Sequence, residues 1–187
     1  MSQPTQKEIE EKKPKKINGK EVVQKILEGK GLPKRYFLFG PSGSGKTLRS
    51  ILLAAKHNES YYDKALSRYW NNYKGEKVVV VDGVTSENYK YIKSGLEKWM
   101  DYSSFNGLIY KGKKEGGEEV ETEDVIIDPK EYTLIVTSRE SPDDLFREES
   151  EIKQEKLKKF FVFEECEEVK EQDDKKRLVK EWYEEDK

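Results

Sequence analysis

The stretch that decides the fold is Gly40-Pro41-Ser42-Gly43-Ser44-Gly45-Lys46-Thr47. It fits the pattern G-x-x-x-x-G-K-[ST], in which glycines let backbone N–H groups converge on phosphate oxygens. Residues 36–39, an apolar run, predict a strand before the loop, and residues 45–56 predict a helix after it. The N-terminus of that helix would point its unpaired donors at the same anion. Strand, loop and helix in this order predict a P-loop that binds a nucleoside triphosphate.

The loop also predicts two side-chain contacts and a metal. We expect Lys46 to reach the β- and γ-phosphates and the Thr47 hydroxyl to ligate Mg²⁺. A P-loop further needs an acid at the end of a neighbouring strand. Residues 78–81 are four consecutive valines, typical of a strand buried on both faces in a parallel sheet, and Asp82 follows them directly. The expected cofactors are therefore ATP and Mg²⁺, with Thr47 and Asp82 as metal ligands.

The rest of the pattern predicts an α/β fold. Residues 134–136 and 160–163 read as further buried strands, residues 89–100 as a helix, and residues 108–111 and 125–127 as the arms of a hairpin. We expect a mostly parallel sheet flanked by helices. In the helix after the P-loop, four apolar residues are expected to face the core: Leu48, Ile51, Leu52 and Ala55.

Composition limits the organisation of the chain. Its 187 residues are 34% hydrophobic and 40% charged, which predicts one compact domain with solvated ends. We expect a disordered basic arm over residues 1–17, a P-loop domain over residues 18–166 and a charged helix or tail over residues 167–187. The net charge of −2 gives no bulk attraction to nucleic acid, so any such contact needs a local patch.

Cysteine content and hydropathy indicate the cellular compartment of the protein. The chain has one cysteine, Cys166, which excludes an intrachain disulfide and a cysteine-based zinc site. The first residues are polar and lysine-rich, unlike a secretory signal. No apolar run approaches the about 20 residues that span a bilayer. We expect an intracellular protein with no membrane contact.

A larger pattern surrounds the P-loop. Residues 68–76, RYWNNYKGE, run into the valine strand and are similar to a W-W-x-x-Y-x-G segment, and residues 108–112 read LIYKG. Residues 134–138, LIVTS, are followed by PDDLF at residues 142–146. In this order the pieces resemble the superfamily 3 helicase domain of replication initiator (Rep) proteins from small circular single-stranded DNA viruses and related plasmids.

The resemblance implies a function and an assembly. It implies an AAA+-like domain, a ring of about six subunits, ATP hydrolysis at subunit interfaces, and translocation on single-stranded DNA during replication. It places residues 108–112 at the start of a DNA-contacting hairpin, with Lys111, Lys113 and Lys114 as the contacts. It also implies a location in the cytoplasm, or in a host nucleus if the chain is viral.

The sequence departs from the family at two positions. Gly83 stands where a second acid usually helps to activate water, and Arg139 stands where an asparagine senses the γ-phosphate. Glu87 is a candidate replacement for the acid, and Arg147 is a candidate for the arginine that one subunit supplies to its neighbour. Losing both family residues would leave phosphate binding intact and slow hydrolysis.

Several alternatives stay open. A nucleotide-binding switch or assembly module with weak hydrolysis fits Gly83 and Arg139. A kinase also begins with a P-loop, although the region after Ser138 has few of the arginines that a kinase lid uses. The acidic run at residues 118–124 argues against DNA contact through the hairpin. Five aromatic residues before the valine strand either pack in the core, the simpler use, or stack on bases: Tyr61, Tyr62, Tyr69, Trp70 and Tyr73.

Overall fold

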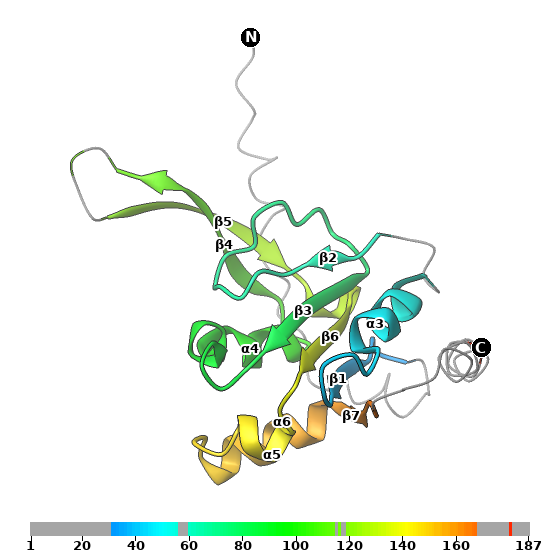
Figure 1. Cartoon of the computed structure of the whole chain (residues 1–187). Helices are drawn as coiled ribbons and strands as arrows, with labels where there is room; N and C mark the ends of the chain where they lie inside the picture. Colours follow the sequence, from blue (N-terminus) through cyan, green and yellow to red (C-terminus); the bar gives the residue numbers. More distant parts are fainter. Residues whose placement is uncertain (1–30, 56–59, 115, 117–118, 168–179, 181–187) are drawn as a thin grey trace.

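The computed structural model describes residues 31–55, 60–114, 116, 119–167 and 180. Within them a five-stranded parallel sheet has the order β2-β3-β6-β1-β7, and β4 and β5 form a separate antiparallel hairpin (Figure 1). The strands are β1 Arg35–Phe39, β2 Tyr62–Asp63, β3 Val78–Val84, β4 Phe105–Lys113, β5 Val120–Ile127, β6 Thr133–Ser138 and β7 Val162–Glu165. The helices are α3 Lys46–Ala55, α4 Lys93–Met100, α5 Pro142–Leu145 and α6 Glu151–Phe160, with the 3-10 turns η1 Tyr89–Tyr91 and η2 Pro129–Glu131. The predicted α/β fold with a parallel sheet flanked by helices is confirmed.

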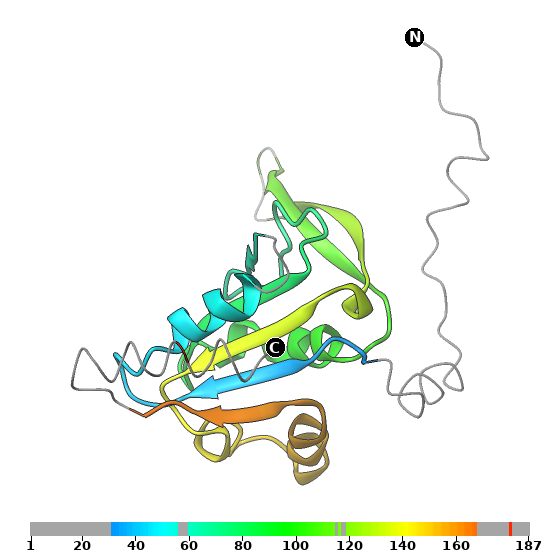
Figure 2. The ribbon, with the colours of Figure 1, turned by 90° about the vertical axis from the view of Figure 1, so that its right-hand side faces the viewer.

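The order of the strands brings the candidate site together. β1, which leads into the P-loop, lies between β6 and β7, and β6 also pairs with β3 (Figure 2). All of these pairs are parallel, so the carboxyl ends of the strands meet at one edge of the sheet. Parallel α/β sheets place their ligands at this edge.

Alternation along the strands divides the core into two layers. On one face, Leu53 and Ala54 of α3 cover Leu38, Val80 and Ile135. On the other face, α4, α5 and α6 cover the alternate positions, which include Phe37, Val79, Val81, Leu134 and Val136. Because both faces are covered, β1, β3 and β6 carry continuous apolar runs, as predicted. The prediction of a buried strand is wrong for β7, which lies at the edge of the sheet and has Val162 51% exposed.

The predicted buried face of α3 is wrong. Leu48 and Ile51 are each 42% exposed, whereas Arg49, Ser50, Leu53 and Ala54 are buried. Arg49 lies over the sheet because its Nε donates to Glu164 Oε1 of β7 at 3.0 Å. The face of α3 that contacts the strands is therefore the one that carries Arg49, Leu53 and Ala54.

Two other predicted boundaries shift. The helix expected over residues 89–100 is divided into η1 and α4, and the strand expected over residues 160–163 starts at Val162. Phe160 belongs to α6, and Phe161 ends that helix by donating its N–H to the Leu157 carbonyl at 3.1 Å.

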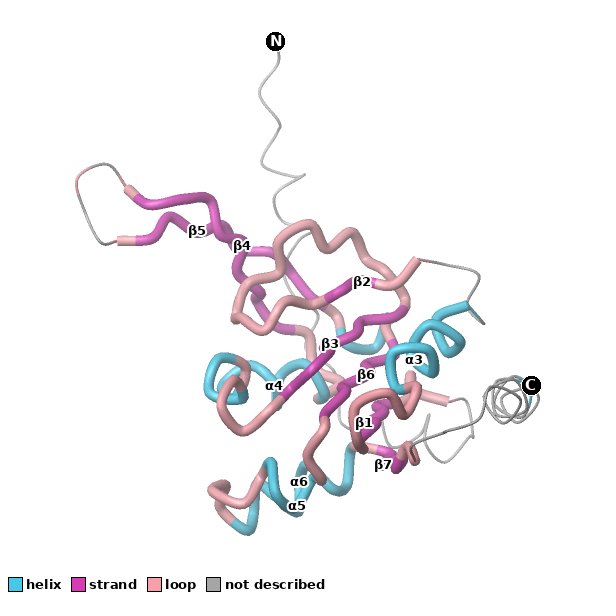
Figure 3. Tube along the Cα trace, viewed as in Figure 1, coloured by secondary structure: helices cyan, strands magenta, loops and turns pink. Residues whose placement is uncertain are grey.

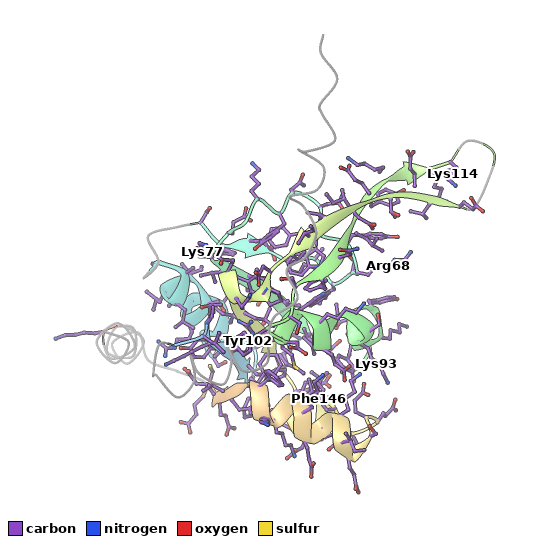
Figure 4. All side chains as sticks on the ribbon, turned by 180° about the vertical axis from the view of Figure 1, so that it is seen from behind. Arg68, Lys77, Lys93, Tyr102, Lys114 and Phe146 are labelled. Atoms are coloured by element: carbon purple, nitrogen blue, oxygen red, sulfur yellow. The ribbon has the colours of Figure 1, made fainter. Side chains whose placement is uncertain are left out.

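A buried arginine fastens the start of β1. Arg35 is 1% exposed, and its guanidinium donates to the carbonyls of Tyr132 and Pro129 at 2.7 Å each and of Met100 at 3.1 Å. Its Cζ lies 4.4 Å from the centre of the Tyr102 ring, which Figure 4 marks. Burial lowers the pKa of this guanidinium, but its contacts are those of a charged donor. Arg35 is thus a structural tie between β1, α4 and η2.

The aromatic segment before β3 enters the core. Trp70 is 1% exposed and stacks on Tyr62 with ring centres 5.8 Å apart, and Tyr73 lies edge-on at 5.2 Å. Core packing is therefore the use of these three residues. Tyr69 and Tyr61 lie outside this cluster, and Tyr61 is 39% exposed.

The hairpin is longer than predicted and projects from the body past the β2 edge of the sheet (Figures 1 and 3). Its register shifts between Tyr110 and Gly112, which marks a bulge in β4. The bulge lets the two arms continue to pair beyond the body.

Some predictions fall on parts of the chain that are not described. The expected arm over residues 1–17 and most of the expected tail over residues 167–187 lie outside the described residues. Among the described residues, no helix is both long enough and apolar enough to cross a bilayer.

Candidate nucleotide site

The P-loop has the backbone that its glycines predict. Gly40, Gly43 and Gly45 adopt φ values of +140°, +81° and +86°. Residues with a side chain rarely adopt these angles, so glycine is required for the turn. The loop leaves the end of β1 and enters α3 at Lys46, which directs the N-terminus of this helix at the loop.

Gly40 has a second reason to be glycine. A Cβ built on it would lie 2.1 Å from the backbone oxygen of Cys166. The N–H of Cys166 donates to the Phe39 carbonyl at 2.7 Å, which holds the end of β7 against the start of the loop. Burial raises the pKa of the Cys166 thiol to about 11, so this cysteine is a packed neutral residue.

Lys46 lies against its own loop. Its Nζ donates to the carbonyls of Gly40 at 2.7 Å and Pro41 at 2.6 Å, and to Ser44 Oγ at 3.1 Å. Burial lowers the pKa of Lys46, and the nearby charge of Arg139 lowers it further, whereas Cys166 and Asp82 act to raise it. The P-loop lysine, Asp82 and Arg139 therefore share one electrostatic environment.

Asp82 is held by the strand between it and the P-loop. Thr137 of β6 is 1% exposed and donates its hydroxyl to Asp82 Oδ1 at 2.6 Å. The same hydroxyl accepts from the Gly83 N–H at 2.9 Å. The Asp82 side chain is thereby fixed at the edge of the sheet that carries the P-loop, and the residue itself stays exposed.

The loop after β6 joins the P-loop to the loop after β3. The Ser138 carbonyl accepts from the Gly40 N–H at 3.2 Å, which places Arg139 directly beside the P-loop. The Glu140 carboxylate accepts from the N–H of Ser86 at 3.1 Å and from its hydroxyl at 3.2 Å. Glu140 therefore ties the two loops together on the far side of Asp82.

The two candidate catalytic residues lie apart from the P-loop contacts. Glu87 is exposed in the loop between β3 and η1. Arg147 follows α5, pairs with Asp144, and lines a cavity of about 410 Å³ with Glu140, Ser86 and Tyr89. Arg147 is exposed, and the contact that holds its guanidinium is the Asp144 carboxylate, three residues before it.

Among the described residues, no group of three or more histidine, cysteine, aspartate and glutamate side chains could hold a metal ion alone. A P-loop site does not need one, because phosphate oxygens and water complete the magnesium shell. The Thr47 hydroxyl is exposed at the start of α3, and Asp82 offers a hard carboxylate oxygen. The donor set therefore fits Mg²⁺ bound together with a triphosphate.

The three hairpin lysines are exposed, but two have acidic partners. Lys111 pairs with Glu123, and Lys114 Nζ lies 2.9 Å from Glu119 Oε2. The pair with Lys111 lowers the pKa of Glu123. These cross-strand pairs reduce the positive charge that the hairpin offers to phosphate.

Sequence reasoning did not assign three residues their contacts at this site. Thr137 stands on a predicted strand, but its bond to Asp82 depends on β6 being inserted next to β3. Cys166 touches Gly40 only because β7 pairs with β1. The link from Glu140 to Ser86 likewise joins segments that are 54 positions apart.

Comparison with known proteins finds a similarity to one family over part of the chain. The family model described as RNA helicase matches residues 36–110, which begin in β1 and end in β4. The match includes the P-loop, the aromatic segment, Asp82 and the first six residues of β4, and covers less than half of the chain. No match to the chain was found among curated proteins. The similarity points to a helicase-type NTPase domain.

Proposed function

We propose that this chain is an ATP-dependent helicase domain of the Rep type, which couples ATP hydrolysis to movement on single-stranded DNA. The observation that carries the proposal is the joint placement of the P-loop, Asp82 and Thr137 at one edge of a parallel sheet. The match to the RNA helicase family supports it, because that match extends from this edge into the hairpin.

In this proposal each part of the site has one task. The P-loop N–H groups and Lys46 bind the β- and γ-phosphates. To do so, the Lys46 ammonium leaves the loop carbonyls of Gly40 and Pro41 and donates to phosphate oxygens instead. Thr47 and Asp82 hold Mg²⁺, which when bound neutralises charge on the phosphates. Arg139, beside the P-loop, adds a cation near the terminal phosphate.

The water-activating group and the assembly are part of the same proposal. Glu87 is the candidate acid from the chain's own loop, and Arg147 is the candidate arginine from a neighbouring subunit. The exposure of the Arg147 side chain, which a neighbouring subunit could reach, supports a role in trans. A ring of about six subunits is the assembly that would bring it to the neighbour's nucleotide.

The decisive experiment measures ATP turnover with and without single-stranded DNA, and with single-stranded RNA in a parallel arm. We expect stimulation by a single strand, and loss of turnover in Lys46→Ala and Asp82→Asn. Calorimetric ATP binding should be lost in Lys46→Ala, because this variant lacks the cation that the loop supplies. Unchanged ATP affinity in a folded Lys46→Ala variant contradicts the nucleotide site.

A second function, a nucleotide-binding switch with weak hydrolysis, is favoured by Gly83. This residue has φ +70°, a conformation that a glutamate would adopt only with strain of about 1–2 kcal/mol. The family's second acid would therefore carry this strain here, although nothing lies within 4 Å of a Cβ at this position. Tight ATP binding with neither turnover nor stimulation would favour the switch over the helicase.

A further inference from the structure

An aromatic and cationic patch lies at the base of the hairpin, outside the core and apart from the nucleotide site. The ring centres of Tyr69 and Tyr110 lie 5.5 Å apart. The Arg68 guanidinium lies 5.1 Å from the Tyr69 ring centre, and its Nη2 donates to the Tyr69 hydroxyl at 3.1 Å. Tyr110 is 40% exposed, Tyr69 is half-buried and Arg68, which Figure 4 labels, is exposed, so solvent reaches the patch.

The patch is built by backbone pairing and not by chance contact of mobile side chains. Tyr69 forms a parallel bridge with Leu108 of β4, and the Trp70 N–H donates to the Leu108 carbonyl at 2.7 Å. Two positions on, the Asn71 side chain donates to the Tyr110 carbonyl and accepts from the Tyr110 N–H, both at 2.9 Å. Trp70 is anchored in the core, so the rings beside it are held in a fixed place.

The register of the hairpin separates this patch from most of the acidic run. Cross-strand partners share a face and successive residues alternate between faces. Tyr110 is opposite Thr122, whereas Glu123 is opposite Ile109 and Glu121 is opposite Gly112, so both glutamates lie on the other face. Lys113, opposite Val120, shares the face of Tyr110, and Asp124 is the single β5 acid on that face.

We infer that the patch of Arg68, Tyr69 and Tyr110 is the principal contact for a single-stranded nucleic acid, whose bases stack on the tyrosine rings. Exposed rings beside cations are the usual platform for unpaired bases, and Arg68 and Lys113 can meet the backbone phosphates. The inference rests on the proposed helicase function and names its nucleic-acid site. It moves the main contact from the hairpin lysines, of which Lys111 and Lys114 are paired with acids, to the hairpin base.

The test compares stacking variants with charge variants of the full chain. Binding of a short fluorescein-labelled oligothymidylate, and of oligouridylate in parallel, is measured by anisotropy at two salt concentrations with a non-hydrolysable ATP analogue. Tyr110→Ala should weaken binding about 10-fold with little change in salt slope, and Tyr110→Trp should retain it. Arg68→Ala should lower the slope of log K by about 0.7.

A matched control is available on another element. Tyr91 of η1 is 56% exposed and has the Lys90 ammonium 5.1 Å from its ring centre, so it has the same chemistry without the hairpin. Tyr91→Ala should bind like the wild type. The combined variant Lys111→Ala with Lys114→Ala should lose less affinity than Tyr110→Ala.

The outcomes separate this inference from the function on which it rests. If the wild type binds and Tyr110→Ala binds equally well, the patch is overturned and the helicase proposal stands. A greater loss in the double lysine variant than in Tyr110→Ala also overturns the patch. If the wild type binds neither probe, both the nucleic-acid patch and the proposed translocation on a single strand are overturned. The proposed ATP site is then still tested separately, by calorimetry on Lys46→Ala.

Discussion

At the scale of single residues, the nucleotide site depends on two positions whose importance comes from tertiary neighbours. Gly40 lies under the backbone of Cys166, and Thr137 connects Asp82 to the sheet. Each has a matched control in the same element or loop. Substitutions at these positions therefore test the packing of the site separately from its phosphate chemistry.

Gly40→Ala should destabilise the fold by on the order of 2–3 kcal/mol. The new Cβ would lie 2.1 Å from a backbone oxygen, at a φ of +140° that alanine rarely adopts. Gly43→Ala is the control, because its φ is also positive and nothing lies within 4 Å of its Cβ. Urea unfolding measures both, and an equal effect of the two substitutions would show that β7 does not press on the loop.

Thr137→Val should weaken the magnesium dependence of ATP binding about 10-fold and leave the fold intact. It removes the hydroxyl that donates to Asp82 and accepts from the Gly83 N–H, while its volume is retained. Thr133→Val, on the same strand and also buried, is the control. Titration of Mg²⁺ in calorimetry with ATP measures the effect. If ATP binding depends on Mg²⁺ equally in Thr137→Val and in the wild type, Asp82 does not need the Thr137 hydroxyl to hold its position.

At the scale of elements, the segment between β2 and β3 is fastened by a buried lysine. Lys64 is 1% exposed, and its Nζ donates to the carbonyls of Ala65 and Ser67. The same ammonium lies 4.5 Å from the Trp99 ring centre and 5.4 Å from that of Trp70. Burial lowers the pKa of Lys64 to about 7, although the two indole faces favour its charged form.

The free energy of unfolding should therefore rise with pH above about 7. Between the folded pKa of about 7 and the ordinary lysine value of 10.5, the unfolded chain binds a proton that the folded chain has lost. Lys64→Met should remove this dependence, whereas Lys113→Met, at an exposed lysine, should retain it. Urea unfolding at pH of about 6 and about 9 measures the difference. If the free energy of unfolding changes with pH in the same way in the wild type and in Lys64→Met, Lys64 stays charged in the folded protein.

At the scale of the whole molecule, the nucleotide site and the hairpin occupy different parts of the fold. The P-loop lies at the carboxyl edge of the sheet, and the hairpin projects past β2 (Figure 1). Trp70 joins the base of the hairpin to the core, because it packs against Trp99 of α4 at 5.7 Å and neighbours Tyr69 in the patch. The two candidate sites can therefore be tested by separate substitutions.

The proposed trans role of Arg147 is tested by mixing two inactive variants. Lys46→Ala keeps Arg147 and lacks a working P-loop, whereas Arg147→Ala keeps the P-loop and lacks the arginine. If Arg147 completes a neighbour's site, the mixture should hydrolyse ATP faster than either variant alone. Light scattering should show assembly with ATP and Mg²⁺. A fully active Arg147→Ala variant would contradict the role.

Local patterns in the sequence determined much of this protein. The P-loop, the four-valine strand with Asp82 after it, and the alternation of apolar and turn residues are read from adjacent positions, because strands, helices and glycine turns follow local rules. They predicted the α/β fold and the residues of the phosphate loop. The wrong prediction for the buried face of α3 shows the limit, since Arg49 on that face is paired with Glu164 of a distant strand, which no local pattern reveals.

Only the tertiary structure decided which distant segments meet. The insertion of β6 between β1 and β3 gives Asp82 its partner, and the pairing of β7 with β1 places Cys166 over Gly40. The parallel bridge from Tyr69 to Leu108 leaves Tyr69 half-buried outside the core and its neighbour Trp70 inside it. From the sequence, Tyr69 and Trp70 had the same two possible roles, packing in the core or stacking on bases. Strand order and register separated them, because these depend on contacts between segments that no local pattern encodes.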